Sequence, residues 1–254
     1  TQKKNKIISL IFILIEKITN SICNRIIFIR KLDYKLSLRK NLSSTEKSIY
    51  IKTQISLDAD SSKKLNIREE YNINTKYIIM NAGSIYDIKN PALFIEIAKK
   101  ILVSRDDITF IWFGDGYSRA KLNQMLKQEG IENYIKFVGP VKKELMLSIY
   151  SQIDIFLLTS KVEVFPTVIL ESFLSKKLVF STQFKGVEEI ISHGQTGFSY
   201  DFKNTSGVAE EIVNLLLDKS KYKVITEKAK DFFDTNFNDY KNFARIHGEL
   251  YRKL

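Results

Sequence analysis

Scarce cysteine and histidine restrict the chemistry open to this chain of 254 residues, which contains one cysteine, Cys23, and two histidines, His193 and His247. A single cysteine excludes an internal disulfide bond and a metal site built from several cysteines. Two histidines give little support to catalysis by a histidine-bound metal. The apolar run Ile7–Ile15, interrupted only by Ser9, has nine residues. A membrane-spanning helix needs roughly 20, so this run is too short to cross a bilayer.

The same N-terminal run has some features of a signal peptide. Three lysines lie among the first six residues, but no cleavage site of small residues precedes Glu16 and Lys17. We therefore predict a helix that is buried or lies on a membrane surface, and burial is the preferred interpretation. The chain begins with Thr1 rather than Met, which suggests a fragment or a processed piece.

Positive charge is in excess, with 40 Lys and Arg residues against 29 Asp and Glu and a net charge of +11. Such a balance suits an anionic partner, which includes a nucleotide, a membrane surface and nucleic acid. It is equally compatible with the Lys-, Ile- and Asn-rich composition of low-GC coding. Because the lysines are spread along the chain and no recognised nucleic-acid motif occurs, we do not expect a nucleic-acid partner.

From residue 77 onward, short apolar runs alternate with helical patterns. The runs are Tyr77–Ala82, Ile108–Phe113, Ile135–Val138, Ile153–Leu158 and Leu178–Ser181. Helical patterns begin at Asn90-Pro91 and cover residues 118–127, 142–151, 208–217, 221–233 and 240–254. Strands that alternate with helices indicate βαβ units, so we predict an α/β fold with a doubly wound parallel sheet of the Rossmann-like type.

Glycine and polar residues follow the ends of the predicted strands. The motifs are Gly83-Ser84, with Lys89 shortly after it, then Gly114-Asp115-Gly116, Gly139-Pro140 and Thr159-Ser160-Lys161. Each motif alone is typical of an ordinary turn. Ligands of doubly wound sheets bind beyond the carboxyl ends of the strands, so the motifs together predict a ligand site there.

The segment that follows the fourth predicted strand combines two carboxylates with a helix start. We predict that Phe165 is the N-cap and that Pro166 occupies the first helical position. Phe165 has no side-chain oxygen, so the N–H groups of residues 167–169 are expected to stay open for a phosphate. Glu163 and Glu171 flank this helix start. Taken by themselves, the two acids are more simply an exposed loop acid and an ordinary helix acid.

The longer run from Glu163 to Gly197 carries a more specific signal, because glutamate, seven residues and glutamate are followed by a short strand and His193-Gly-Gln-Thr-Gly197. This run resembles the nucleotide-sugar signature of the retaining glycosyltransferases of group 1, family 4. The resemblance covers about Lys64 to Asp218. It implies the two-domain GT-B fold, of which this chain would hold the C-terminal half and a residual piece of the N-terminal domain.

The resemblance also implies roles for these residues. Glu163 would contact the transferred sugar near its reacting carbon, and Glu171 would accept hydrogen bonds from the ribose hydroxyls. Lys89 and the amides of Thr167 and Val168 would hold the diphosphate and stabilise the leaving group, without an obligatory metal. Glu163 and Lys89 are thus the expected catalytic residues, and no separate cofactor is expected.

Other donor-binding positions follow from the same family pattern. Gly83, Gly114 and Gly139 match glycines of the family, and the last of these would border the nucleobase. Ser84 stands where the family has arginine, and Val164 where it usually has a small residue. Phe165 and Pro166 match the family in the loop before the helix.

The implied function is retaining transfer from a nucleotide sugar, expected to be a UDP-sugar, to a polysaccharide or lipid-linked acceptor. The alternative is a donor-binding module that is inactive alone and needs a partner or a missing acceptor domain. The expected location is the cytoplasm, with association at the inner face of the membrane. The expected organisation is a remnant of the acceptor domain at 1–45 that consists of a helix, a strand and a helix, an interdomain segment at 46–75, the donor domain at 76–236 and a crossing helix at 237–254.

Overall fold

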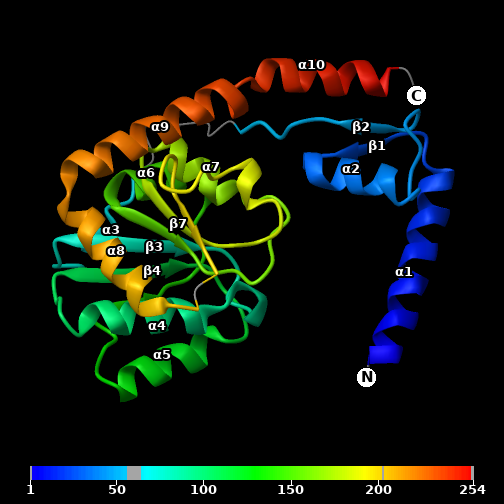
Figure 1. The fold of residues 1–254 in the computed structure, drawn as a ribbon. Helices are drawn as coiled ribbons and strands as arrows, with labels where there is room; N and C mark the ends of the chain where they lie inside the picture. Colours follow the sequence, from blue (N-terminus) through cyan, green and yellow to red (C-terminus); the bar gives the residue numbers. More distant parts are fainter. Residues whose placement is uncertain (1, 56–63, 202, 253–254) are drawn as a thin grey trace. The chain divides into compact units, whose positions relative to one another are not determined.

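The computed structural model describes residues 2–55, 64–201 and 203–252. The chain divides into two compact units (Figure 1). Unit 1 comprises residues 1–54 and 239–254, and unit 2 comprises residues 55–238. The range 46–75, predicted as an interdomain segment, is divided between them, because residues 48–50 form a strand in unit 1 and Ile67 is buried in unit 2. Residues 1, 56–63, 202, 253 and 254 of the predicted segments lie outside the described residues.

A parallel sheet of six strands forms the centre of unit 2. Its strands are β3 (Tyr77–Ala82), β4 (Ile108–Phe113), β5 (Ile135–Phe137), β6 (Ile155–Leu158), β7 (Leu178–Thr182) and β8 (Phe198–Tyr200). Their order across the sheet is β5-β4-β3-β6-β7-β8, and every neighbouring pair is parallel. This is the strand order of a Rossmann fold. The predicted α/β class with a doubly wound parallel sheet is confirmed.

Helices cover both faces of this sheet, which explains why its strands read as continuous apolar runs. The helices are α3 (Ile67–Glu70), α4 (Pro91–Leu102), α5 (Arg119–Gln128), α6 (Met146–Gln152), α7 (Thr167–Leu174), α8 (Thr205–Leu217) and α9 (Lys219–Phe237), with short 3-10 turns at Asp87–Lys89, Lys143–Leu145 and Val187–Glu189. Helices α4, α5 and α8 pack on one face, and α3, α6, α7 and α9 contribute to the core on the other. Phe94 of α4 packs edge to face on Phe110 and Trp112, which anchors the first of these layers.

Strand β8 was not among the predicted strands, and β6 begins at Ile155 rather than Ile153. β8 has three residues, Phe198–Tyr200, which are too few to form an apolar run that a sequence pattern could reveal. It pairs with β7 at the edge of the sheet. Phe198 stacks on Phe180 of β7 with 4.9 Å between ring centroids. Pairing with β7 and aromatic contacts of Phe198 and Tyr200 with Phe180 therefore hold this edge strand.

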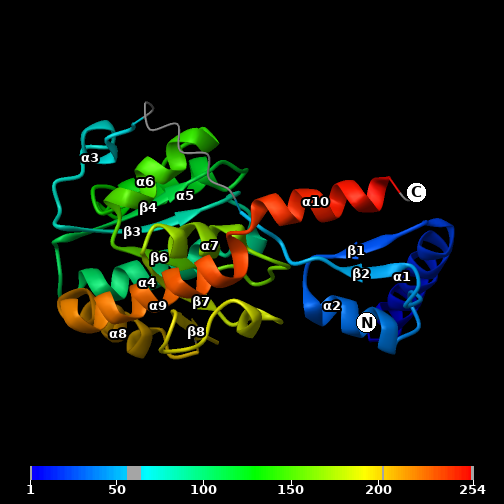
Figure 2. The ribbon, with the colours of Figure 1, turned by 90° about the horizontal axis from the view of Figure 1, so that it is seen from above.

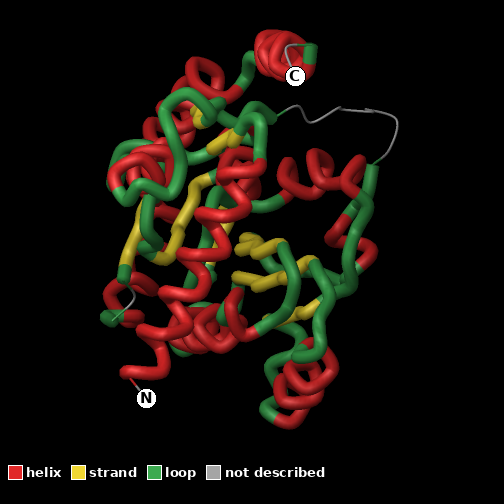
Figure 3. Tube along the Cα trace, turned by 90° about the vertical axis from the view of Figure 1, so that its right-hand side faces the viewer, coloured by secondary structure: helices red, strands yellow, loops and turns green. Residues whose placement is uncertain are grey.

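Unit 1 contains a small parallel sheet and three helices. Its elements are α1 (Gln2–Ile22), β1 (Ile26–Phe28), α2 (Lys31–Arg39), β2 (Ser48–Tyr50) and α10 (Tyr240–Tyr251). β1 and β2 run side by side in parallel, as Figure 2 also shows. The predicted helix, strand and helix before residue 40 are present. Figure 3 shows the chain from a third side, with helices in red and strands in yellow.

The prediction that the apolar run Ile7–Ile15 is buried is wrong for the residues that can be described. Leu10, Phe12 and Ile22 of α1 are exposed by 64%, 65% and 77%. The helix contacts its own unit through another side, where the Asn20 side chain donates to the Leu42 carbonyl at 3.0 Å. Within residues 2–55, 64–201 and 203–252, no helix combines the length and the apolarity that crossing a membrane requires.

Candidate functional site

Strands β3 and β6 are neighbours whose chain continuations lead to opposite faces of the sheet. After β3 the chain enters α4, and after β6 it enters α7, which packs on the other face. Two hydrogen bonds join the loops at this point. Lys161 N–H donates to the Ile88 carbonyl at 2.8 Å, and the Thr159 hydroxyl donates to the Lys89 carbonyl at 3.0 Å. The site predicted from the strand ends therefore lies at the topological switch point of the sheet.

An ion pair crosses this switch point. Lys89 Nζ lies 2.6 Å from Glu163 Oε1, although 73 residues separate the two in the chain. The side chains are 27% and 11% exposed, so solvent screens the pair only partly. The structure thus brings together the two residues predicted as catalytic. Lys89 Nζ has three N–H donors, so an anionic ligand that binds it can do so beside Glu163 or in its place.

The second predicted glutamate, Glu171, is held by a tyrosine that the sequence did not reveal. Tyr150 on α6 is fully buried, and its hydroxyl lies 3.1 Å from Glu171 Oε2 and 3.3 Å from the Val168 carbonyl. Its single proton can be donated to only one of these oxygens at a time. Tyr150 matches an ordinary core position in a helical pattern, so no local signal could have assigned it to the site.

The surroundings of Glu171 change the pKa of its carboxyl group. Burial raises the pKa of Glu171, and hydrogen bonds from Tyr150 and Thr167, together with the charge of Lys143, offset part of this effect. Burial also raises the pKa of Tyr150. Burial thus disfavours the ionised form of Glu171, and its hydrogen-bond donors favour that form.

The raised pKa of Glu171 predicts a pH dependence of stability. Since the folded chain binds this proton more tightly than the unfolded chain, the free energy of unfolding should fall as pH rises from about 4.5 through the raised pKa. Glu171→Gln removes this titration, so the stability difference between variant and wild type should shift in favour of the variant over that window. Urea unfolding at a series of pH values measures the difference. A difference that stays constant with pH would contradict the prediction.

The three predicted donor-site glycines lie on adjacent loops that contact one another. Gly83 N–H donates to the Phe113 carbonyl at 2.9 Å, and Gly114 N–H donates to the Gly139 carbonyl at 3.2 Å. A Cβ atom on Gly114 would lie 1.9 Å from the Gly83 carbonyl oxygen. Only glycine permits this close approach. Ser84 is half-buried in the same β3 loop.

The start of α7 differs from the prediction in two ways. The helix begins at Thr167, and Pro166 is its N-cap, because the ψ angle of 103° at Pro166 is extended rather than helical. The Ile169 N–H donates to the Pro166 carbonyl at 3.2 Å, so it is not an open amide. Phe165 is not the N-cap and packs on Phe237 of α9, with 6.0 Å between ring centroids. Of the three amides predicted to bind a phosphate, this start of α7 excludes that of Ile169 and leaves those of Thr167 and Val168.

Val164, which stands where the family usually has a small residue, is 56% exposed. Its side chain thus projects from the loop between Glu163 and the start of α7. Among the described residues, no group of three or more His, Cys, Asp or Glu side chains is placed to hold a metal ion. The prediction of transfer without an obligatory metal stays a prediction.

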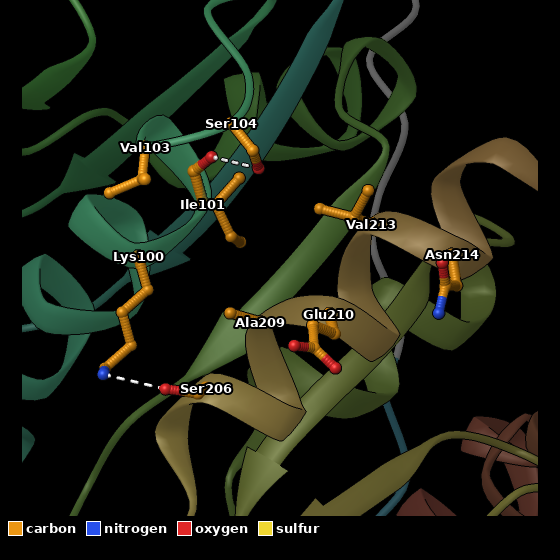
Figure 4. Close-up of a pocket in the computed structure, with 9 residues that line it drawn as sticks. All are labelled: Lys100, Ile101, Val103, Ser104, Ser206, Ala209, Glu210, Val213 and Asn214. Atoms are coloured by element: carbon orange, nitrogen blue, oxygen red, sulfur yellow. Dashed lines mark hydrogen bonds between the residues drawn. The ribbon is translucent and has the colours of Figure 1, made fainter.

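A cavity of about 490 Å³ lies elsewhere in unit 2, between α4 and α8 (Figure 4). Lys100 Nζ and Ser206 Oγ, 3.0 Å apart, lie on its wall, as do Ile101 and Val213. Its α4 residues come from the end of the helix that leads into β4, which is the amino edge of the sheet. The cavity is therefore separate from the Lys89 and Glu163 site.

The sheet order, the glycine loops and the site at the switch point define a Rossmann-like α/β domain of the kind found in GT-B proteins. The chain belongs to the family of glycosyl transferases group 1, whose model matches residues 63–232. The resemblance stated from the sequence is thereby confirmed.

Individual relatives agree with this assignment. N-acetyl-alpha-D-glucosaminyl L-malate synthase of Bacillus anthracis is 27% identical over 189 residues, which are 74% of this chain and 49% of that protein. The solved C-terminal domain of the group 1 glycosyl transferase LpcC of Francisella tularensis is 26% identical, with a TM-score of 0.61, and the match covers 72% of this chain and all of that domain.

The HepE protein of Anabaena, solved with UDP and glucose, has a TM-score of 0.77 at 18% identity, covering 94% of this chain and 66% of that one. At this identity the likeness shows the fold alone. The chain spans about half the length of the curated relatives it matches.

Proposed function

We propose that this chain binds a nucleotide sugar, a UDP-sugar in particular, and takes part in transferring its sugar with retention of configuration. The observation that carries the proposal is the Lys89 and Glu163 ion pair at the switch point of the sheet. Lys89 is the cation for the diphosphate, together with the amides of Thr167 and Val168. Bound UDP in HepE, a protein of similar fold, supports this choice of nucleotide.

The chemistry suits these residue types. Sugar transfer from a nucleoside diphosphate develops negative charge on the leaving phosphate and positive charge on the sugar carbon. Lys89 and the two amides stabilise the first charge, and Glu163 orients the sugar and stabilises the second. Glu171 accepts hydrogen bonds from the ribose hydroxyls, with Tyr150 fixing one of its oxygens. Positioning and electrostatics then supply the catalytic effect without a separate cofactor.

Binding of UDP is the direct test. Calorimetric titration should give saturable binding of UDP, and Lys89→Gln should weaken it by about tenfold, because a charge-assisted contact to phosphate is lost. The same variant should bind uridine, which has no phosphate, as weakly as the wild type does. Lys121→Gln, at an exposed position on α5, is the matched control and should leave UDP affinity unchanged. Absence of saturable binding of UDP, GDP and ADP would refute the proposed function.

The second candidate is a donor-binding module that is inactive alone and needs a partner or a missing acceptor domain. On this view UDP binds, but the chain transfers no sugar to a polysaccharide or lipid-linked acceptor. Turnover with such an acceptor would favour the complete enzyme. Conversion of the free nucleotide sugar without any acceptor would instead indicate a GT-B epimerase.

The wider setting is also a proposal. Two relatives carry names that refer to acceptors, the phosphatidylinositol N-acetylglucosaminyltransferase GPI3 subunit of Saccharomyces cerevisiae and a Vi polysaccharide biosynthesis protein of Salmonella typhi. They support an acceptor for this chain that is a glycolipid or a cell-surface polysaccharide. The matching location is the cytoplasm, at the inner face of the membrane. Unit 1 is then the remnant of the acceptor domain, and α10 is the helix that returns to it.

A further inference from the structure

Two tyrosines from different loops stack on each other at the carboxyl edge of the six-stranded sheet. Tyr86 follows β3 and Tyr117 follows β4. Their ring centroids are 5.1 Å apart, and their ring planes form an angle of 38°. Both rings are accessible, with 43% of Tyr86 and 69% of Tyr117 exposed. The proposed donor site uses neither residue.

Backbone contacts within unit 2 hold the loops that carry the two tyrosines. The Ile85 N–H donates to the Asp115 carbonyl at 2.9 Å. A Cβ atom on Gly116 would collide with the Ile85 carbonyl oxygen, so the two loops touch directly. The Asp115 carboxylate also accepts from the Gly116 N–H at 2.8 Å, which fixes the turn before Tyr117. The tyrosine pair is therefore held in place by residues of unit 2 itself.

The tyrosine pair and the proposed ribose site lie on opposite sides of the sheet edge. Tyr86 and Tyr117 precede α4 and α5, which pack on one face, whereas Glu171 belongs to α7 on the other face. Lys89 lies between them, because its N–H donates to the Tyr86 carbonyl at 2.8 Å while its ammonium group reaches Glu163. A donor with its ribose at Glu171 and its diphosphate at Lys89 leaves the tyrosines on the side of its sugar end.

The spacing of the strands indicates which sugar ring the tyrosines can meet. Glu163 follows β6, and β6, β3 and β4 are consecutive neighbours in the sheet. Neighbouring strands are about 4.8 Å apart, so the ends of β6 and β4 are separated by about 10 Å. This separation is larger than the width of one pyranose ring. With the transferred sugar at Glu163, the ring at the tyrosines is the next one, which belongs to the acceptor.

We propose that Tyr86 and Tyr117 form a platform on which a pyranose ring of the acceptor stacks, so that the acceptor of this chain is a carbohydrate. The face of an aromatic ring carries partial negative charge, and the C–H groups on the face of a pyranose carry partial positive charge, so the two faces attract each other. The phenol hydroxyls can also bond to sugar hydroxyls. An acyl chain has no such polarised ring face. The inference rests on the proposed function and names the acceptor class of that site.

Titration of the full chain with cellotriose and with chitotriose, each in the presence of UDP, tests the platform. The ring substituents of both sugars are equatorial, so every ring presents C–H groups on both faces whatever the natural acceptor is. The wild type should bind at least one of them saturably. Tyr86→Leu with Tyr117→Leu should weaken this binding about tenfold, because both aromatic faces are lost. Tyr86→Phe with Tyr117→Phe keeps the faces and should stay within about threefold of the wild type.

Tyr134→Leu is the matched control, since Tyr134 is a half-buried tyrosine of unit 2 that precedes β5 and so lies at the opposite, amino edge of the sheet. It should leave glycan affinity unchanged, and circular dichroism verifies the fold of each variant. Calorimetric titration with UDP separates the two proposals. A wild type that binds no UDP would refute the proposed function.

Three other outcomes would overturn the platform alone. They are a wild type that binds UDP but neither glycan, equal glycan affinity of the wild type and the double leucine variant, and a double leucine variant that loses affinity for UDP and not for the glycan. The last outcome would identify the tyrosines as a surface for the nucleobase.

Discussion

Glu171→Ala is expected to weaken UDP binding at least about thirtyfold, because the loss of even one hydrogen bond to a charged acceptor costs about 2 kcal/mol. In the proposed complex the ribose hydroxyls donate to Glu171, and the alanine variant has no acceptor there. Tyr150 keeps an acceptor in the variant, since the Val168 carbonyl lies 3.3 Å from its hydroxyl. The protein should therefore stay folded. Calorimetric titration of variant and wild type measures the effect.

A change of ligand provides the control for this prediction. A UDP analogue that lacks both ribose hydroxyls should bind the wild type and Glu171→Ala with similar affinity, because the contact is already absent. Glu227→Ala removes an exposed acid that pairs with Lys176 at 2.9 Å, and it should leave UDP affinity unchanged. If Glu171→Ala weakened the analogue as much as UDP, Glu171 would act through the fold and not through the ribose.

Gly114→Ala is expected to lower the free energy of unfolding by about 3 kcal/mol or more and to abolish UDP binding. The added Cβ would lie 1.9 Å from the Gly83 carbonyl oxygen, and the φ angle of 154° at Gly114 is one that L residues rarely adopt. Backbone strain and overpacking each cost about 1 to 3 kcal/mol. Urea unfolding gives the stability, and titration of the folded fraction gives the binding.

Gly130→Ala separates the two causes. Gly130 also has a positive φ angle, of 69°, but a Cβ there would meet no atom within 4 Å. This variant should lose only about 1 kcal/mol from backbone strain and should bind UDP normally. A similar loss of stability in both variants would mean that the contact between the β3 and β4 loops is unimportant.

Some elements could be predicted residue by residue because their signal is local. Strands β3 and β4 match the predicted runs at both ends, since each is a run of six residues with five apolar or aromatic side chains, followed by glycine. Strand β8 has three residues and no such run. The start of α7 was predicted one residue too early, at Pro166, because the φ angle of proline fits both the N-cap and the first helical position.

Contacts between segments that are far apart in the sequence could not be predicted and were found only in the structure. Lys89 and Glu163 were predicted to act on the same ligand, but their ion pair depends on β3 and β6 being neighbours, which no local pattern specifies. The Tyr150 contact with Glu171 joins α6 to α7 in the same way. The exposure of α1 was missed for a different reason, since an apolar run shows that a partner is needed but not whether the same chain supplies it.

The ion pair between Lys89 and Glu163 has a consequence for the order of events at the proposed site. Before a ligand arrives, each of these side chains neutralises the other, so neither charge is left unpaired in a half-buried place. A diphosphate that binds Lys89 competes with Glu163 for the ammonium group. Wherever it displaces Glu163, the carboxylate becomes available to the sugar once the phosphates are bound, and this exchange of partners would couple donor binding to readiness for transfer.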